Sequence, residues 1–213
     1  MIKTKKNLII FMPFIGGGGV EKNLFIIANH LSKKFKKIKI CTLSRKKLGE
    51  FNSKIKYLGP KKNINEKINI KVKYLISLFI LFRFLIKNKN STVFAFQANI
   101  YCIVLCKLLK VKIIVRSNSS PSGWYHNFFK KIIYKYLISK ADCVIVNSIE
   151  FKKQMQKKFN IFVNCIFNPL DLKKIRKLSN SGLADPFFNK NKCLKLINLG
   201  RFTDQKDQIT ILK

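Results

Sequence analysis

The sequence predicts an α/β protein built on a doubly wound parallel sheet. Short apolar runs of strand length alternate with segments whose apolar residues recur every three or four positions, as on one face of a helix. Strands separated by helices favour a parallel sheet with right-handed crossovers. The first apolar run also leads into four glycines, Gly16 to Gly19, and then into a helical pattern. Strand, glycine-rich turn and helix form the opening unit of such a sheet.

The first strand is expected at residues 7–13, Asn-Leu-Ile-Ile-Phe-Met-Pro, because a strand buried on both faces of a parallel sheet is a continuous apolar run. As the alternation continues, further strands are expected at residues 38–43, 55–58, 92–96, 112–116, 143–146 and 165–167.

The helices are expected between these runs. Helical spacing predicts that the first helix places on one face Leu24, Ile27, Ala28, Leu31 and Phe35. Further helices are predicted at residues 70–87, 100–110, 128–140 and 150–159, with a short basic helix at residues 170–178.

At 213 residues, the chain has room for one large domain and part of a second. We expect a Rossmann-like domain over residues 1–170 and a linker over residues 171–192, where Ser, Asn, Gly and Pro are frequent. Residues 193–213 would begin a second domain with a strand at residues 194–199 and a helix from near Asp207. The chain is expected to end inside that helix, leaving the second domain incomplete.

The chain is strongly basic, with 44 Lys and Arg against 9 Asp and Glu and a net charge of +35. This balance favours anionic partners such as nucleic acid, phosphorylated ligands or an anionic membrane surface. Lys, Asn, Ile and Phe are abundant together, so a compositional background is the alternative explanation. Lys far outnumbers Arg, whereas a dedicated phosphate-reading protein usually enriches Arg for its planar bidentate fork. With 47% apolar residues, disorder is excluded as the main state.

The six cysteines form no Cys-x-x-Cys pair and have no histidine at metal-ligand spacing. We expect them to be reduced, which is typical of a cytoplasmic protein, and we expect neither a metal nor a cofactor. The apolar stretch after the basic amino terminus runs into glycines without a cleavage site, so a signal peptide is not expected.

Residues 74–86 are strongly apolar but are interrupted by Arg83 and bounded by Lys73 and Lys87. The segment is too short to span a bilayer, which needs about 20 apolar residues. It is either a buried helix or a basic-flanked helix that enters a membrane interface.

Two glycine-containing loops are candidates for phosphate binding. The glycines at 16–19 let backbone amides approach a ligand at a helix start, although the spacing does not fit G-x-G-x-x-G and a simple tight turn is the alternative. The loop after the predicted strand at 194–199 carries Arg201 and Lys206, which can converge on one diphosphate without a metal.

A third candidate is Arg116-Ser117-Asn118, at the carboxyl end of a predicted strand, where α/β sheets place ligands. His126 and His30 are the two histidines, and neither completes a Ser-His-Asp or Cys-His arrangement. Carboxylates are too scarce to favour a two-carboxylate glycosidase.

Taken in order, four segments resemble the retaining family-4 glycosyltransferases of the GT-B fold. They match its Gly-Gly-x-Glu, its A-D-x-V-I-x-x-S strand, its N-P-x-D segment and its G-R-(L/F)-x-x-Q-K-(G/D) loop. In this chain they are Gly18 to Glu21, Ala141 to Ser148, Asn168 to Asp171 and Gly200 to Asp207.

The resemblance implies a nucleotide-sugar donor and a glycan or lipid-linked acceptor in cell-surface polysaccharide or lipopolysaccharide synthesis. It implies hexosyl or N-acetylhexosaminyl transfer with retention, and donor-phosphate binding by Gly18, Gly19, Arg201 and Lys206. The catalytic candidates are Arg116 and Asn118, since the histidine frequent in this loop of the family is absent. The implied location is cytoplasmic, at the inner face of the membrane and in peripheral contact with anionic lipid.

The family's E-x7-E motif is missing, so the chain is expected to be a fragment with little activity alone. Two alternatives remain open. One is a non-enzymatic nucleic-acid-binding protein, although no recognised module is present and the aromatic residues fall mostly within apolar segments, which argues against a nucleic-acid partner. The other is an inactive glycosyltransferase remnant.

Overall fold

The computed structural model describes residues 4–62, 64–65, 67–118, 128–180, 195, 197–198, 200, 202 and 207–211. The chain divides into two compact units, Met1–Leu170 and Asp171–Lys213. In the second unit, α6 (Leu172–Ser179) forms where the short basic helix is predicted, and α8 (Gln208–Ile211) follows Asp207. The predicted strand at 194–199 lies mostly outside the described residues.

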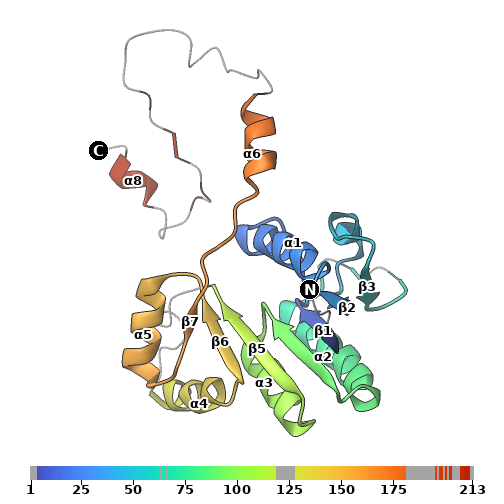
Figure 1. Ribbon diagram of the computed structural model, residues 1–213. Coiled ribbons are helices and arrows are strands. Elements are labelled where there is room, and N and C mark those ends of the chain that lie inside the picture. The colour runs from blue at the N-terminus through green and yellow to red at the C-terminus, as the bar shows by residue number, and fades with distance from the viewer. Residues whose placement is uncertain are drawn as a thin grey trace. The chain divides into compact units, whose positions relative to one another are not determined.

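The first unit is built on one sheet whose neighbouring strands are all parallel (Figure 1). The strands are β1 (Thr4–Phe11), β2 (Phe35–Cys41), β3 (Ile55–Leu58), β4 (Ser91–Ala95), β5 (Lys112–Ser117), β6 (Cys143–Val146) and β7 (Asn164–Cys165). Their order in the sheet is β3-β2-β1-β4-β5-β6-β7. This arrangement confirms the predicted doubly wound α/β fold. The chain reverses its direction of progress between β1 and β4, and that boundary is the topological switch point.

Helices cover both faces of the sheet. On one face, α1 (Gly19–Leu31) packs Leu24 and Ala28 against Leu8 and Ile10 of β1. The other face carries α2 (Ile70–Lys87), α3 (Asn99–Leu108), α4 (Phe128–Ser139) and α5 (Ile149–Phe159), each with buried side chains in a single apolar cluster. On this face α2 contacts α3, and α3 contacts α4.

One residue of the predicted first helix belongs to a strand instead. The prediction placed Phe35 on the apolar face of the helix, but α1 ends at Leu31 and Phe35 begins β2. Phe35 pairs in register with Thr4 of β1. Pairing with a distant strand thus overrides a helical spacing that continues locally beyond the end of the helix.

Residues of the segments that resemble the family-4 motifs have local structural roles. Ser148 caps α5 by accepting a hydrogen bond from the Phe151 N–H at 3.1 Å. Asp171 caps α6 in the same way. Asp142 accepts hydrogen bonds at 2.8 Å from the Lys107 ammonium of α3 and from the Ile113 N–H of β5. These contacts explain the residue types at the starts of β6, α5 and α6.

The described cysteines are all free. Cys41, Cys102 and Cys106 are buried, whereas Cys143 and Cys165 are half-buried. Burial raises the pKa of the Cys41 thiol, which therefore behaves as an apolar core group. Within the described ranges, no group of three His, Cys, Asp or Glu side chains is arranged to hold a metal ion.

Candidate functional site

The loops at the carboxyl ends of β1, β4 and β5 lie next to one another. Phe11 pairs in register with Ala95, and Ala95 pairs with Val115. The loop after β1 begins beside the loop after β4 at the switch point, and the loop after β5 follows. Ligands of open α/β sheets bind at this edge. The topology therefore brings together the glycine turn and the Arg116 segment, which are far apart in the sequence.

The glycine turn starts α1 without a side-chain cap on Gly18. Its neighbour Glu21 folds back instead, and its carboxylate accepts a hydrogen bond from the Gly16 N–H at 3.3 Å. A Cβ atom on Gly18 would lie 2.9 Å from a carboxylate oxygen of Glu21, whereas Gly17 and Gly19 are open. The Glu21 carboxylate complements the positive end of α1. A phosphate bound there requires this carboxylate to turn away.

A hydrogen bond from a neighbouring loop fixes the segment that leads to the glycine turn. The Ile15 N–H donates to the Ser44 hydroxyl at 2.9 Å, and the Ser44 N–H donates to the Thr42 hydroxyl at 3.2 Å. The loops after β1 and β2 are thereby joined, so the glycines extend from a fixed base.

Three side-chain amides at this edge have unused hydrogen-bonding capacity. Among the described residues, the buried amide oxygens of Gln97, Asn99 and Asn147 have no hydrogen-bond partner. Gln97 and Asn99 follow β4, and Asn147 follows β6. Between the first two, Ala98 has a left-handed backbone with φ 52°, which is strained for a residue with a Cβ atom. Unpaired buried polar groups and backbone strain both cluster at functional sites.

The amino-acid sequence did not predict a functional role for these three amides. The signal that could have found Gln97 and Asn147 is simple, because each follows an apolar strand nearly at once and so lies at the carboxyl edge of the sheet. Their unpaired state is a tertiary property that no spacing reveals.

Arg116 lies near the end of β5 and is 1% exposed. One guanidinium nitrogen, Nη2, donates to the Ile166 carbonyl at 3.1 Å and to the Asn168 side chain at 3.0 Å. Its Nε donates to the Asn118 amide oxygen at 3.3 Å. Burial lowers the pKa of Arg116, although arginine stays charged at neutral pH. The side chain thus fastens the segment after β7 to β5.

This position bears on the catalytic candidates. Arg116 is enclosed by protein groups, and half-buried Asn118 is one of its partners. Catalytic roles for both residues stay predictions. What the contacts support directly is a positioning role, in which Arg116 holds Asn118 and the segment after β7.

Of the remaining candidates, the two glycines lie at this edge, and the others lie away from it or outside the described residues. Gly18 and Gly19 are exposed at the start of α1. His30 is exposed in the last turn of α1, at the opposite end of that helix. Arg201, Lys206 and His126 lie outside the described residues.

No protein-family model matches the chain. An uncharacterized glycosyltransferase of Methanocaldococcus jannaschii is 32% identical in an alignment of 123 residues that covers 52% of this chain and 30% of that protein.

Solved structures share the fold. Anabaena HepE in complex with UDP and glucose aligns with a TM-score of 0.57 and 12% identity, covering 82% of this chain and 50% of that chain. Phytolacca americana UGT2, complexed with UDP-2fluoro-glucose and pterostilbene, aligns with a TM-score of 0.50 and 11% identity, covering 84% and 58%. The Rossmann-like fold matches that of these GT-B neighbours, and the chain spans about half their length.

Proposed function

We propose that the chain is part of a retaining glycosyltransferase of the family-4 type. It would transfer a hexosyl or N-acetylhexosaminyl group from a nucleotide sugar to a glycan or lipid-linked acceptor. The observation that carries the proposal is the seven-stranded sheet, whose fold is shared with proteins solved in complex with UDP. The 32% identity to a glycosyltransferase of Methanocaldococcus jannaschii supports the same reaction class.

Arg201, Lys206, Gly18 and Gly19 are proposed as donor-phosphate ligands, as the resemblance to family-4 glycosyltransferases implies. A guanidinium fork and an ammonium group neutralise a diphosphate without a metal ion. The acceptor is proposed to use the unfilled hydrogen-bonding capacity of Gln97, Asn99 and Asn147. Sugar hydroxyls both donate and accept hydrogen bonds, so they suit amide side chains.

In the proposed reaction, the bond from the anomeric carbon to the phosphate oxygen breaks. The acceptor oxygen bonds to the same face of that carbon. The acceptor proton passes to the leaving phosphate oxygen, so no protein base is required. The protein then contributes by positioning the two substrates and by stabilising charge on the diphosphate.

Removing the proposed diphosphate ligands should weaken nucleotide binding. Replacing Arg201 or Lys206 by alanine is expected to raise the dissociation constant for UDP about tenfold each, because each change removes a charge-assisted hydrogen bond. Isothermal titration calorimetry measures this directly. The control variant Arg176→Ala/Lys177→Ala removes two charges from α6 and should bind UDP as the natural sequence does. If the control loses as much UDP affinity as the Arg201 and Lys206 variants do, the proposed donor site is wrong.

The helices α2, α3 and α4 present an apolar and basic outer surface, which we call the helical face. Each helix has one exposed apolar stripe at helical spacing, and the three helices contain no acidic residue. The stripes consist of Val72, Leu75, Phe79, Phe82 and Ile86 on α2, Tyr101, Val104 and Leu108 on α3, and Phe129, Ile132, Ile133 and Tyr136 on α4.

Exposed bases border these stripes, including Lys71, Arg83 and Lys87 on α2 and Lys130 and Lys135 on α4. The buried-helix alternative for residues 74–86 holds only in part, because α2 buries Leu81 and Leu85 while it exposes Leu75 and Phe79. The membrane-interface alternative stays a prediction. In the described part of the chain, no helix is long and apolar enough to cross a membrane. We propose that the helical face rests on an anionic membrane at its cytoplasmic side, near a lipid-linked acceptor. Large exposed apolar patches mark interaction surfaces, and bases among apolar side chains suit anionic lipid.

Polar substitutions on the helical face should weaken membrane binding. Leu75→Ser/Phe79→Ser is expected to lower the affinity for phosphatidylglycerol-containing vesicles by at least about tenfold, because two apolar side chains no longer enter the interface. Flotation with and without phosphatidylglycerol measures this. The control Ile149→Ser/Phe162→Ser changes two apolar residues outside α2, α3 and α4 that are also more than half exposed, and it should float normally. If the chain floats equally well without anionic lipid, or not at all, membrane contact of this kind is wrong.

A further inference from the structure

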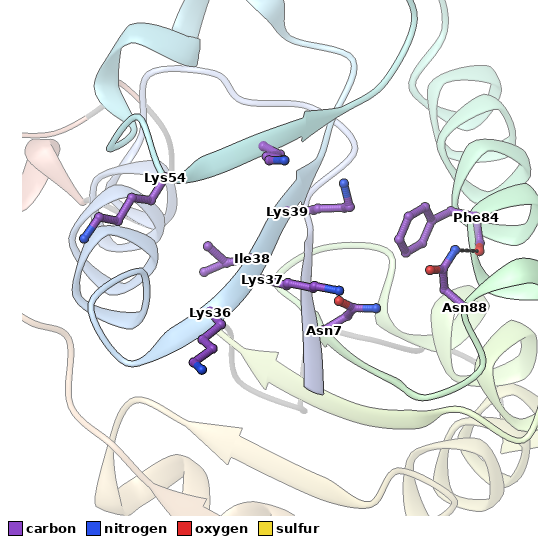
Figure 2. A pocket seen from close by; sticks show the side chains of 9 residues that line it. Asn7, Lys36, Lys37, Ile38, Lys39, Lys54, Phe84 and Asn88 are labelled. Carbon is purple, nitrogen blue, oxygen red and sulfur yellow. Dashed lines mark hydrogen bonds between the residues drawn. The ribbon is translucent and has the colours of Figure 1, made fainter. Parts of the chain in front are cut away.

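A depression at the amino-terminal part of β1, β2 and β3 is lined by lysines (Figure 2). Its volume is about 510 Å³. The candidate site lies at the carboxyl ends of the strands, and this depression lies toward the opposite end of the sheet. The residues that line it are Asn7, Lys36, Lys37, Ile38, Lys39, Lys54, Lys56, Phe84 and Asn88. None of them is acidic.

Strand register places three of these lysines on one face of the sheet. Lys39 pairs with Lys56 of β3, and Lys37 pairs with Asn7 of β1, so all four side chains project toward α2. Figure 2 shows Lys37 and Lys39 on the side of β2 that faces Phe84, with Asn7 beside Lys37. Lys37, Lys39 and Lys56 are called the lysine pocket from here on.

The lysine pocket concentrates like charge, and no acidic side chain lies among the described residues that line the depression. Directly opposed like charges destabilise a pair of strands, and Lys39 and Lys56 are opposed in this way. Partial burial, followed by the charges of Lys56 and Lys37, lowers the pKa of Lys39. The Lys39 ammonium lies 5.4 Å from the centre of the Phe84 ring, which holds it over the depression. No residue that the structure describes forms an ion pair with these three lysines.

Two amides complete the lining with hydrogen-bonding groups. The Asn88 side chain donates to the Phe84 carbonyl at 2.9 Å, which fixes it at the end of α2 (Figure 2). Asn7, which belongs to β1, lies beside Lys37 of β2. A multiply charged oxyanion would relieve the repulsion among the lysines and accept hydrogen bonds from both ammonium and amide groups.

We propose that the lysine pocket is a second anion site, separate from the donor site, that binds a phosphate-bearing ligand with at least two negative charges. The shared chemistry is a phosphomonoester or diphosphate group. Its source is either the headgroup of an anionic lipid, since Phe84 belongs to the helix whose outer stripe forms part of the helical face, or a free phosphate compound.

The test uses the full chain in the Arg201→Ala/Lys206→Ala background, so that the proposed donor site does not contribute. Inorganic pyrophosphate is titrated at constant ionic strength. The variant Lys37→Gln/Lys39→Gln/Lys56→Gln is expected to raise the dissociation constant at least about tenfold, because three charge-assisted contacts are lost. The charge-conserving variant with arginine at the same three positions should retain binding, and circular dichroism checks that each variant is folded.

The matched control is Lys47→Gln/Lys153→Gln/Lys157→Gln, which removes the same charge from the 3-10 helix η1 (Arg45–Glu50) and from α5. It should stay within about twofold of the parent, since the long-range field of the chain contributes little at moderate salt. The proposal is overturned if the control weakens pyrophosphate binding as much as the pocket variant does, or if the parent does not bind pyrophosphate. Either result leaves the proposed glycosyltransferase function standing. The proposal is also overturned if an oligonucleotide binds through the lysine pocket where pyrophosphate does not.

Vesicle flotation separates the two sources of the phosphate. Phosphatidic acid exposes a phosphomonoester, whereas phosphatidylglycerol carries a phosphodiester with a single charge. A pocket variant that loses its preference for phosphatidic acid over phosphatidylglycerol assigns the site to a lipid headgroup. A pocket variant that keeps this preference but loses pyrophosphate binding assigns it to a free ligand.

Discussion

Replacing Leu81 by alanine is expected to lower the free energy of unfolding by about 2–5 kcal/mol, the range for a leucine deleted from a packed core. Leu81 is 0% exposed in α2 and belongs to the cluster that joins α2 to β1 and β4. The loss combines the transfer of the removed methyl groups with the cavity left behind. Urea denaturation followed by circular dichroism measures the change.

The control is Phe79→Ala on the same helix, where the side chain is 58% exposed. It is expected to change the free energy of unfolding by less than about 0.5 kcal/mol. A large loss in this variant would mean that the helical face packs against another protein surface in solution. Dependence of that loss on protein concentration would identify a second copy as the partner and contradict a free membrane-contact surface.

Replacing Arg116 by alanine is expected to cost about 2–4 kcal/mol of folding free energy, because it removes charge-assisted hydrogen bonds and leaves a space. Its guanidinium holds the Ile166 carbonyl and the Asn168 side chain. The loss is moderated because both acceptors are in exposed residues and regain water contacts. Arg116→Lys keeps the charge but not the planar fork, so it should lie between alanine and arginine. Urea denaturation ranks the three proteins.

Arg116 also allows a test between positioning and catalysis. A positioning role predicts that stability falls in Arg116→Lys and that UDP affinity stays unchanged. The proposed transfer activity of the whole enzyme would then fall as far as Asn118 and the segment after β7 lose their position. A variant with unaltered stability and no transfer would instead support the catalytic role that the resemblance suggests.

The sequence predicted the bounds of some helices and strands accurately. β3, β6 and α2 have the predicted bounds. An unbroken apolar run marks the whole length of β6, and a long helical repeat marks that of α2. Elements whose ends depend on partners were less accurate. β7 is only Asn164–Cys165 rather than residues 165–167. The Ile166 carbonyl is bound by Arg116 from another strand, which no local pattern indicates.

Some features of the candidate site were also predicted from the sequence, and others were not. Residue order and spacing identified the glycine turn at Gly18 and Gly19 and placed Arg116 at a strand end. They did not reveal that Arg116 is enclosed, nor that the amide oxygens of Gln97, Asn99 and Asn147 have no hydrogen-bond partner among the described residues. Burial and hydrogen-bond satisfaction depend on which strands become neighbours, so they follow from the topology and not from composition.

The sequence by itself determined the α/β class, because local apolar periodicity distinguishes strands from helices. It also determined the excess of positive charge. Only the tertiary structure decided where that charge gathers. Strand register set Lys39 opposite Lys56 and grouped Lys37 with them. Helix packing turned one side of α2 inward and left the other exposed on the helical face. Both outcomes arise from contacts between segments distant in the chain, and charge and burial take functional meaning only from such contacts.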